Sequence, residues 1–159
     1  MKTRRIYRTA RRDPNRVLYS VEQLEFDPMA RRLCRVLRTG MKVLRLRHTQ
    51  LSLVLVSDRF IRKLNKRYRR QDRSTDVLSF HIGEPTPQGK HTLGDVVISM
   101  GTARRQARVF GKTLVAECAR LAVHGLLHLL GHDHQRPSES RRMFSLQDRL
   151  LRKVLNEEP

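Results

Sequence analysis

Apolar residues recur at regular spacing along most of this chain, and the spacing predicts both strands and helices. Segment 51–56 is mostly apolar, which is typical of a strand inside a sheet, and segments 76–80 and 95–100 predict two further strands. A stretch rich in glycine and proline separates the last two segments, as expected for a turn-rich connection. These two strands are therefore expected to form a hairpin-like pair.

Helical spacing of apolar residues predicts five helices. They are expected to begin at Asp27, after Ser57, near Thr102, at Thr113 and near Pro137. Asp27 and Ser57 are residue types that cap helix N-termini. Strands and helices intermixed in this way predict an α+β fold, a single domain with a mixed β-sheet covered by helices.

The beginning of the chain differs from the rest. Residues 1–20 are basic and weakly patterned, so we expect an N-terminal arm there and the domain in residues 21–159. No hydrophobic signal-peptide core is present, which favours a bacterial cytoplasmic location, although the arginine-rich start leaves organellar import open. Cys34 and Cys118, the two cysteines, lie in apolar helical patterns and are expected to be buried free thiols.

Charge changes this picture of an ordinary domain. The chain has 34 Lys and Arg against 15 Asp and Glu, a formal net charge of +19. An excess of this size over the whole chain is typical of proteins that bind a polyanion. We expect nucleic acid rather than a membrane, because no apolar stretch approaches the ~20 residues of a membrane span.

The strongest chemical signal is the pattern HxxxHxxGxxH formed by residues 124–134. His124 and His128 lie four residues apart and therefore share one face of a helix. Gly131 allows the chain to leave the helix axis and to bring His134 back toward the same point. Three imidazoles without a fourth protein ligand suit one zinc ion with an exchangeable water, so we expect a zincin-like metal helix.

One feature of peptidase metal helices is missing. Peptidases with the HExxH pattern carry a glutamate after the first histidine as the general base, and Gly125 occupies that position here. A zinc metallopeptidase is therefore a weaker alternative. A non-catalytic assembly factor with a structural metal remains a second alternative.

Several segments of the chain together resemble the YbeY family of metal-dependent endoribonucleases. They are HGLLHLLGHDH (124–134), STDVLSF (74–80), LGDVVIS (93–99) and LVLVSDRFIRKLNKRYR (53–69). The resemblance implies a single-strand-specific endoribonuclease of ribosome maturation and quality control that processes the 3′ end of small-subunit rRNA. It also implies rRNA and ribosomal particles as partners, with ribosomal proteins and an assembly GTPase as further candidates.

The resemblance also assigns roles to particular residues. It places the three metal ligands on His124, His128 and His134, and a functionally important arginine on Arg69. Without the resemblance, a basic rim residue is the preferred interpretation of Arg69, because several neighbours are also Lys or Arg. The chain departs from the family pattern at three positions, where it has His81, His132 and Gln147 in place of proline, tyrosine and glutamate.

Two acidic residues near the histidines have open roles. Glu117 precedes His124 by seven residues on nearly the same helix face, and Asp133 adjoins His134. Each can act as a partner of a metal ligand or have a purely structural role. Asp76 and Asp95 stand at the starts of predicted strands, where turn chemistry is the preferred interpretation.

Overall fold

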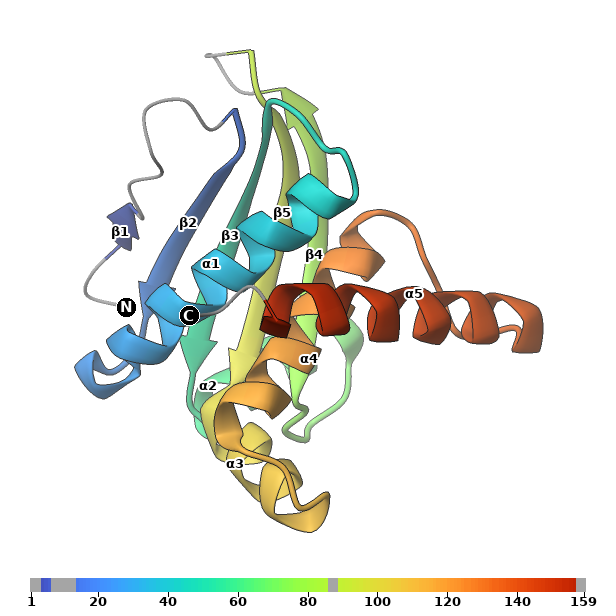
Figure 1. The fold of residues 1–159 in the computed structure, drawn as a ribbon. Helices are drawn as coiled ribbons and strands as arrows, with labels where there is room; N and C mark the ends of the chain where they lie inside the picture. The colour runs from blue at the N-terminus through green and yellow to red at the C-terminus, as the bar shows by residue number, and fades with distance from the viewer. Residues whose placement is uncertain (1–3, 7–13, 86–88, 157–159) are drawn as a thin grey trace.

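The computed structural model describes residues 4–6, 14–85 and 89–156, and these form one sheet with helices on both faces (Figure 1). The strands are β1 (Arg4–Ile6), β2 (Arg16–Val21), β3 (Thr49–Val56), β4 (Val77–Pro85) and β5 (His91–Ser99). The helices are α1 (Asp27–Val43), α2 (Asp58–Arg69), α3 (Met100–Val109), α4 (Leu114–Leu129) and α5 (Pro137–Asn156), and one turn of 3-10 helix (Leu24–Phe26) precedes α1. The expected α+β fold is confirmed.

The sheet is mixed, with the strand order β1-β2-β3-β5-β4. Strands β2, β3 and β5 are parallel, and the outer strands β1 and β4 pair antiparallel with their neighbours. The predicted hairpin-like pair is β4 with β5, and the predicted interior strand is β3, which lies between β2 and β5. One face of the sheet is covered by α1 and α4, with α5 packed against both, and α2 covers the other face (Figure 1).

Strand β2 lies where the sequence indicated only an arm. The expected boundary at residue 20 falls inside this strand, whose side chains from Val17 to Val21 are buried. Its register pairs Leu18 with Ser52 and Val21 with Leu55 of β3. Residues 1–3 and 7–13 of the expected arm lie outside the described residues. The strand escaped prediction because arginines precede it and its apolar run is short.

The ends of the helices follow from local hydrogen bonds. Ser57 caps α2, since its hydroxyl accepts a hydrogen bond from the Phe60 amide at 3.3 Å, as expected. Asp27 was expected to be a cap but is the first residue of α1. Its carboxylate instead accepts hydrogen bonds from the hydroxyl of Tyr19 and the guanidinium of Arg31. The hydrogen bond from Tyr19 holds α1 against β2.

Helix α4 lies unusually close to the sheet. Gly125 is buried there, and a Cβ atom at this position would stand 2.6 Å from the Cγ1 atom of Val96 in β5. The hydroxyl of Ser79 in β4 also donates a hydrogen bond to the Gly125 carbonyl at 3.3 Å. Only glycine allows this approach, so its absence of a side chain sets the height of α4 above the sheet.

Both cysteines are buried free thiols, as expected. Cys34 lies in α1 and Cys118 in α4, and both side chains are inaccessible to solvent. Burial raises the pKa of each thiol to about 12. Among the described residues, no helix is both long and apolar enough to cross a membrane.

The position of α2 depends on Asp58 in its first turn. The Asp58 carboxylate accepts hydrogen bonds from the hydroxyls of Ser99 and Thr102, each at 2.6 Å, and from Arg105 at 2.8 Å. Partial burial would raise the pKa of Asp58, but these three donors lower it to about 2. One carboxylate thus joins the start of α2 to the end of β5 and the start of α3.

We expect Asp58→Ala to lower the free energy of unfolding by about 1–3 kcal/mol, because it leaves the hydroxyls of buried Ser99 and half-buried Thr102 without their acceptor. Urea denaturation at pH 7 measures the loss. Asp72→Ala is the matched control, since Asp72 pairs with Arg62 and Lys66 at the surface. Equal effects of the two substitutions would contradict the special role of Asp58.

Candidate metal centre

Three histidines converge at the end of α4 and in the loop that follows it. His124 and His128 lie on one face of α4, and His134 returns toward them before α5 begins. One ring nitrogen from each histidine lies within 4.8 Å of those of the other two. The turn between them contains Gly131 with a φ of +88°, the left-handed conformation that glycine favours. The clustering expected from the spacing is therefore present.

Gln147 orients the first of these histidines. It is buried on α5, and its Oε1 atom lies 2.8 Å from Nδ1 of His124. Because an amide oxygen can only accept, Nδ1 carries the hydrogen and donates it, which leaves the lone pair on Nε2. That Nε2 faces Nε2 of His128 at 3.0 Å. Two ring nitrogens at this separation are close enough to bind one ion together.

Burial keeps the imidazoles uncharged. Desolvation lowers the pKa of His124 below its ordinary value, although the hydrogen bond that His124 donates to Gln147 acts in the opposite direction. Desolvation, together with the nearby His124 and His134, lowers the pKa of His128 to about 4. Neutral imidazole is the form that binds metal ions, so the two helical histidines hold that form at neutral pH.

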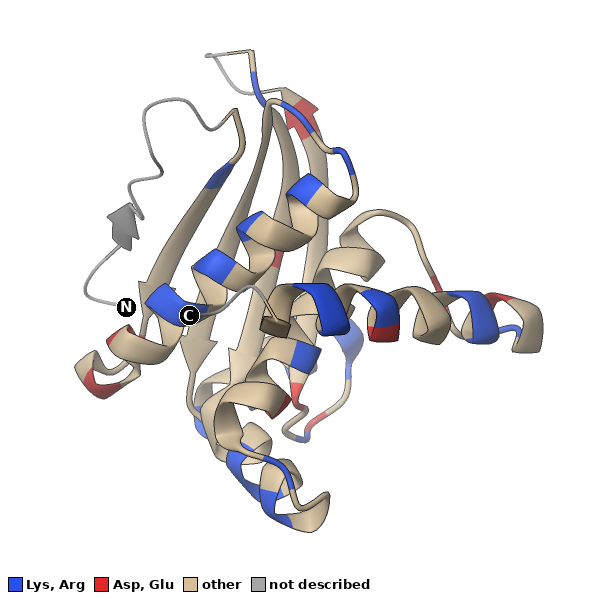
Figure 2. Ribbon diagram, in the orientation of Figure 1, with Lys and Arg blue, Asp and Glu red and all other residues tan. Residues whose placement is uncertain are grey.

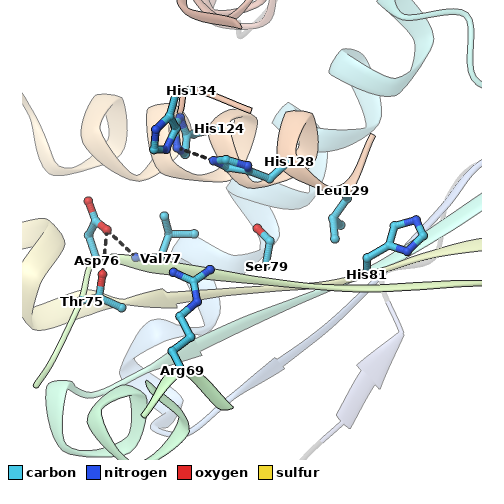
Figure 3. A pocket seen from close by; sticks show the side chains of 10 residues that line it. All are labelled: Arg69, Thr75, Asp76, Val77, Ser79, His81, His124, His128, Leu129 and His134. Carbon is cyan, nitrogen blue, oxygen red and sulfur yellow. Dashed lines mark hydrogen bonds between the residues drawn. The ribbon is translucent and has the colours of Figure 1, made fainter. Parts of the chain in front are cut away.

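The histidines open onto a cavity of about 360 Å³ between α4 and the sheet (Figure 3). Its lining residues are Arg69, Thr75, Asp76, Val77, Ser79, His81, His124, His128, Leu129 and His134. The histidines point into it from one side and Arg69 from the opposite side (Figure 3). Helices α2 and α4 lie on opposite faces of the sheet, but side chains from both line this one cavity beside the edge strand β4.

Arg69 reaches the cavity because α2 ends there. It is the last residue of the helix, and Arg70 follows in the left-handed conformation with a φ of +57°. Buried Asn65 fixes the next loop, since its side-chain amide donates to the Arg73 carbonyl at 2.9 Å. The guanidinium of Arg69 is near enough to His128 to contribute to lowering its pKa.

The acidic candidates have mainly structural contacts. Glu117 is fully buried and forms an ion pair with Arg120 at 2.6 Å. Asp133 accepts a hydrogen bond from the backbone amide of His134 at 2.7 Å, which stabilises the turn. Asp76 faces the cavity, and its carboxylate accepts from the Val77 amide at 2.8 Å. It therefore combines the expected turn chemistry with a place in the cavity wall.

Three other residues near the site had no assigned role in the sequence. Thr75 and Ser79 bring hydroxyls to the cavity, and Phe144 of α5 stacks against His124 and His134 with ring centroids 6.2 and 6.3 Å away. The Phe144 side chain remains 42% exposed, so its outer face is open to a planar ligand. The sequence gives one signal for this contribution of α5 to the site: an aromatic residue stands close to the polar Gln147 on an otherwise apolar helix face.

Comparison with known proteins agrees with this geometry. The family model described as "Endoribonuclease YbeY" matches residues 17–155. This chain belongs to the YbeY family. A YbeY protein of Myxococcus xanthus is 49% identical over 140 residues, which cover 86% of this chain and 47% of that protein. The YbeY protein of Aquifex aeolicus is 47% identical over 116 residues, covering 72% of this chain and 77% of that one.

Another YbeY relative, from a Sulfurihydrogenibium species, is 38% identical over 88% of this chain and 93% of its own length. The chain spans about half the length of the first three curated relatives, at 47%, 53% and 53%. The solution structure of TM1509 from Thermotoga maritima matches with a TM-score of 0.64 and 28% identity, covering 90% of both chains. The YbeY resemblance seen in the sequence is confirmed.

We expect the protein in buffer with a chelator to lose stability as the pH falls from about 6.5 to about 4. The folded state holds His128 at a pKa of about 4, against 6.5 for an ordinary histidine, so the unfolded state binds the proton first. Urea midpoints measured across this range test the expectation. An equally steep loss in His128→Asn would show that His128 is not the source.

Proposed function

We propose that this protein is a metal-dependent endoribonuclease that cleaves single-stranded RNA. The observation that carries the proposal is the meeting of three imidazoles and one guanidinium across a single cavity. Imidazoles bind a divalent ion, and a guanidinium binds phosphate oxygens, so together they fit a phosphodiester. The relatives from Myxococcus and Aquifex are both named endoribonucleases, which supports the same activity here.

His124, His128 and His134 would hold one zinc ion per chain. The fit rests on the facing Nε2 atoms of the two helical histidines and on the buried amide of Gln147, which fixes the tautomer of one of them. A set of three nitrogen donors suits zinc with one open coordination position. When bound, the ion supplies Lewis acidity to a water molecule or to a phosphate oxygen.

Arg69 and two hydroxyls would position the substrate. The Arg69 guanidinium can donate two parallel hydrogen bonds to nonbridging phosphate oxygens, whose negative charge grows during cleavage. Thr75 and Ser79 line the same cavity and can donate to the same phosphate. Arg69 is exposed and lines the cavity, so a bound strand would cover it and strengthen these contacts.

The charge of the molecule supports RNA as the substrate. Lys and Arg are spread over α1, α2, α3 and α5 (Figure 2), and the whole chain carries a formal charge of +19. We infer that the substrate is rRNA, with the 3′ end of small-subunit rRNA as the processed region and ribosomal particles as the setting. Ribosomal proteins, an assembly GTPase and a bacterial cytoplasmic location are parts of the same proposal.

The two alternatives receive less support. A peptidase of this type needs a general base after its first histidine, and Gly125 leaves no room for one because Val96 already fills that space. A non-catalytic assembly factor does not require Arg69 to face the histidines across a cavity.

The central test measures zinc content and ribonuclease activity on the same purified sample, with casein as a parallel peptidase substrate. We expect about one zinc per chain, cleavage of single-stranded RNA and no cleavage of casein. His124→Ala, His128→Ala and His134→Ala should each remove most of the metal and the RNA cleavage together. Full zinc content in a folded triple variant would refute the site, and RNA cleavage independent of zinc would refute the mechanism.

Arg69→Ala should lower single-turnover RNA cleavage by about 100-fold at saturating RNA, because it removes a donor to charge that develops in the transition state. Metal content should stay unchanged. Arg69→Lys should restore little, since lysine keeps the charge but lacks the planar fork.

Arg73→Ala is the matched control for Arg69. Its guanidinium lies in the following loop and bonds to Gln71 at 3.2 Å, outside the cavity lining. We expect a modest loss of affinity that lower salt restores, with the cleavage step intact. Equal, salt-reversible effects for Arg69 and Arg73 would make Arg69 a part of the binding surface only.

A further inference from the structure

A second basic hollow lies beside the metal centre, and the function proposed above does not use it. It has a volume of about 410 Å³ and is lined by His132, Arg141, Arg142, Ser145, Leu146 and Arg149. Arg141, Ser145 and Arg149 follow one another at intervals of four residues, so they share one face of α5. His132 closes the hollow from the loop between α4 and α5. We call this the α5 hollow.

The α5 hollow is joined to the metal centre through shared walls. A hollow of about 460 Å³ lies between them and is lined by Arg69, His128, Gly131, His132, Asp133, His134 and Gln135. It shares Arg69, His128 and His134 with the cavity of the metal centre and His132 with the α5 hollow. The three hollows therefore adjoin one another through these residues, so a strand that lies over the histidines can pass His132 to reach the arginines of α5.

The arginines of the α5 hollow are not neutralised. Arg141, Arg142 and Arg149 are all exposed, and within residues 14–85 and 89–156 none of them forms an ion pair with a carboxylate. Arg62 and Arg105, by contrast, pair with Asp72 and Asp58. Three guanidinium groups around one depression, with a serine hydroxyl between them, provide the donors that a phosphate group requires.

We propose that the α5 hollow binds a backbone phosphate of the same RNA strand that lies in the metal centre, at a nucleotide beyond the cleaved bond. The proposal rests on the endoribonuclease function proposed above and adds a second contact to it. This second contact makes binding depend on the length of the RNA strand, because only an RNA that extends past the cleaved bond can occupy both sites. Phe144 precedes Ser145 on α5, so the intervening base can stack on its exposed face.

The binding test compares two variants with the same loss of charge. One replaces Arg141, Arg142 and Arg149 with alanine. The other, the α3 control, replaces three exposed residues with alanine: Arg104 and Arg108 of α3 and Lys112 in the loop that follows it. Fluorescence anisotropy with a labelled single-stranded RNA gives Kd over a range of salt. The α5 variant should bind about 10-fold more weakly than the control, with a log–log salt slope that is less negative by about 0.7 per phosphate lost.

The position test uses RNA in which one phosphate at a time is replaced by an uncharged methylphosphonate. In the wild-type protein, a single linkage at a distance from the cleaved bond should be sensitive: its replacement should raise KM without changing kcat. In the α5 variant the same replacement should have no further effect, because the contact is already absent. The α3 control should keep the sensitivity of the wild-type protein, and zinc content should be equal in all three.

The outcomes distinguish failure of the α5 hollow from failure of the proposed endoribonuclease function. Equal weakening in the α5 and α3 variants, or a methylphosphonate penalty that survives in the α5 variant, overturns the α5 hollow as a phosphate site. If the α5 substitutions weaken RNA binding as expected but the wild-type protein cleaves no RNA, the endoribonuclease function fails, and the α5 hollow is retained as a phosphate-binding site. If it binds no RNA, both proposals fail.

Discussion

The close approach of α4 to the sheet at Gly125 is the constraint on which the candidate site depends. The missing side chain lets the helix backbone contact Val96 and accept a hydrogen bond from Ser79. This contact fixes the height of the helix, and the histidines one residue before and three residues after it are fixed with it. A larger residue would lift α4 from β4 and β5 and widen the cavity. The glycine thus sets the spacing between the metal ligands and the strand that carries Ser79.

Each wall of the cavity is held by a separate polar contact made outside it. Asp58 ties the start of α2 to β5 and α3, and so fixes the helix whose far end presents Arg69. Gln147 ties α5 to α4 through His124. The ion pair of Glu117 and Arg120 lies one and two helical turns before His124 and stabilises the buried part of α4. The residues that surround the cavity are therefore preorganised by residues that do not face it.

Much of this arrangement could be predicted from the sequence, because it follows from local rules. The Ser57 cap, the interior strand β3 and the return of His134 after Gly131 each depend on residues close together in the chain. What could not be predicted depends on distant partners. β2 is a strand because β3 pairs with it, and Gln147 faces His124 only because α5 packs across α4. The role of Asp58 is of the same kind, since its partners lie more than 40 residues away.

The two buried thiols have a consequence for which metals the protein can select. Cys34 and Cys118 stay protonated inside the core, with pKa values of about 12, so neither offers the soft thiolate that singles out copper(I). The histidine cluster is the candidate site among the described residues, and its donors are all imidazole nitrogens. The affinity of such a set follows the Irving–Williams order, in which copper(II) binds more tightly than zinc, so affinity alone does not select zinc. The ion that fills it in the cell would then be decided by metal supply, and the ion found after overexpression would reflect the growth medium.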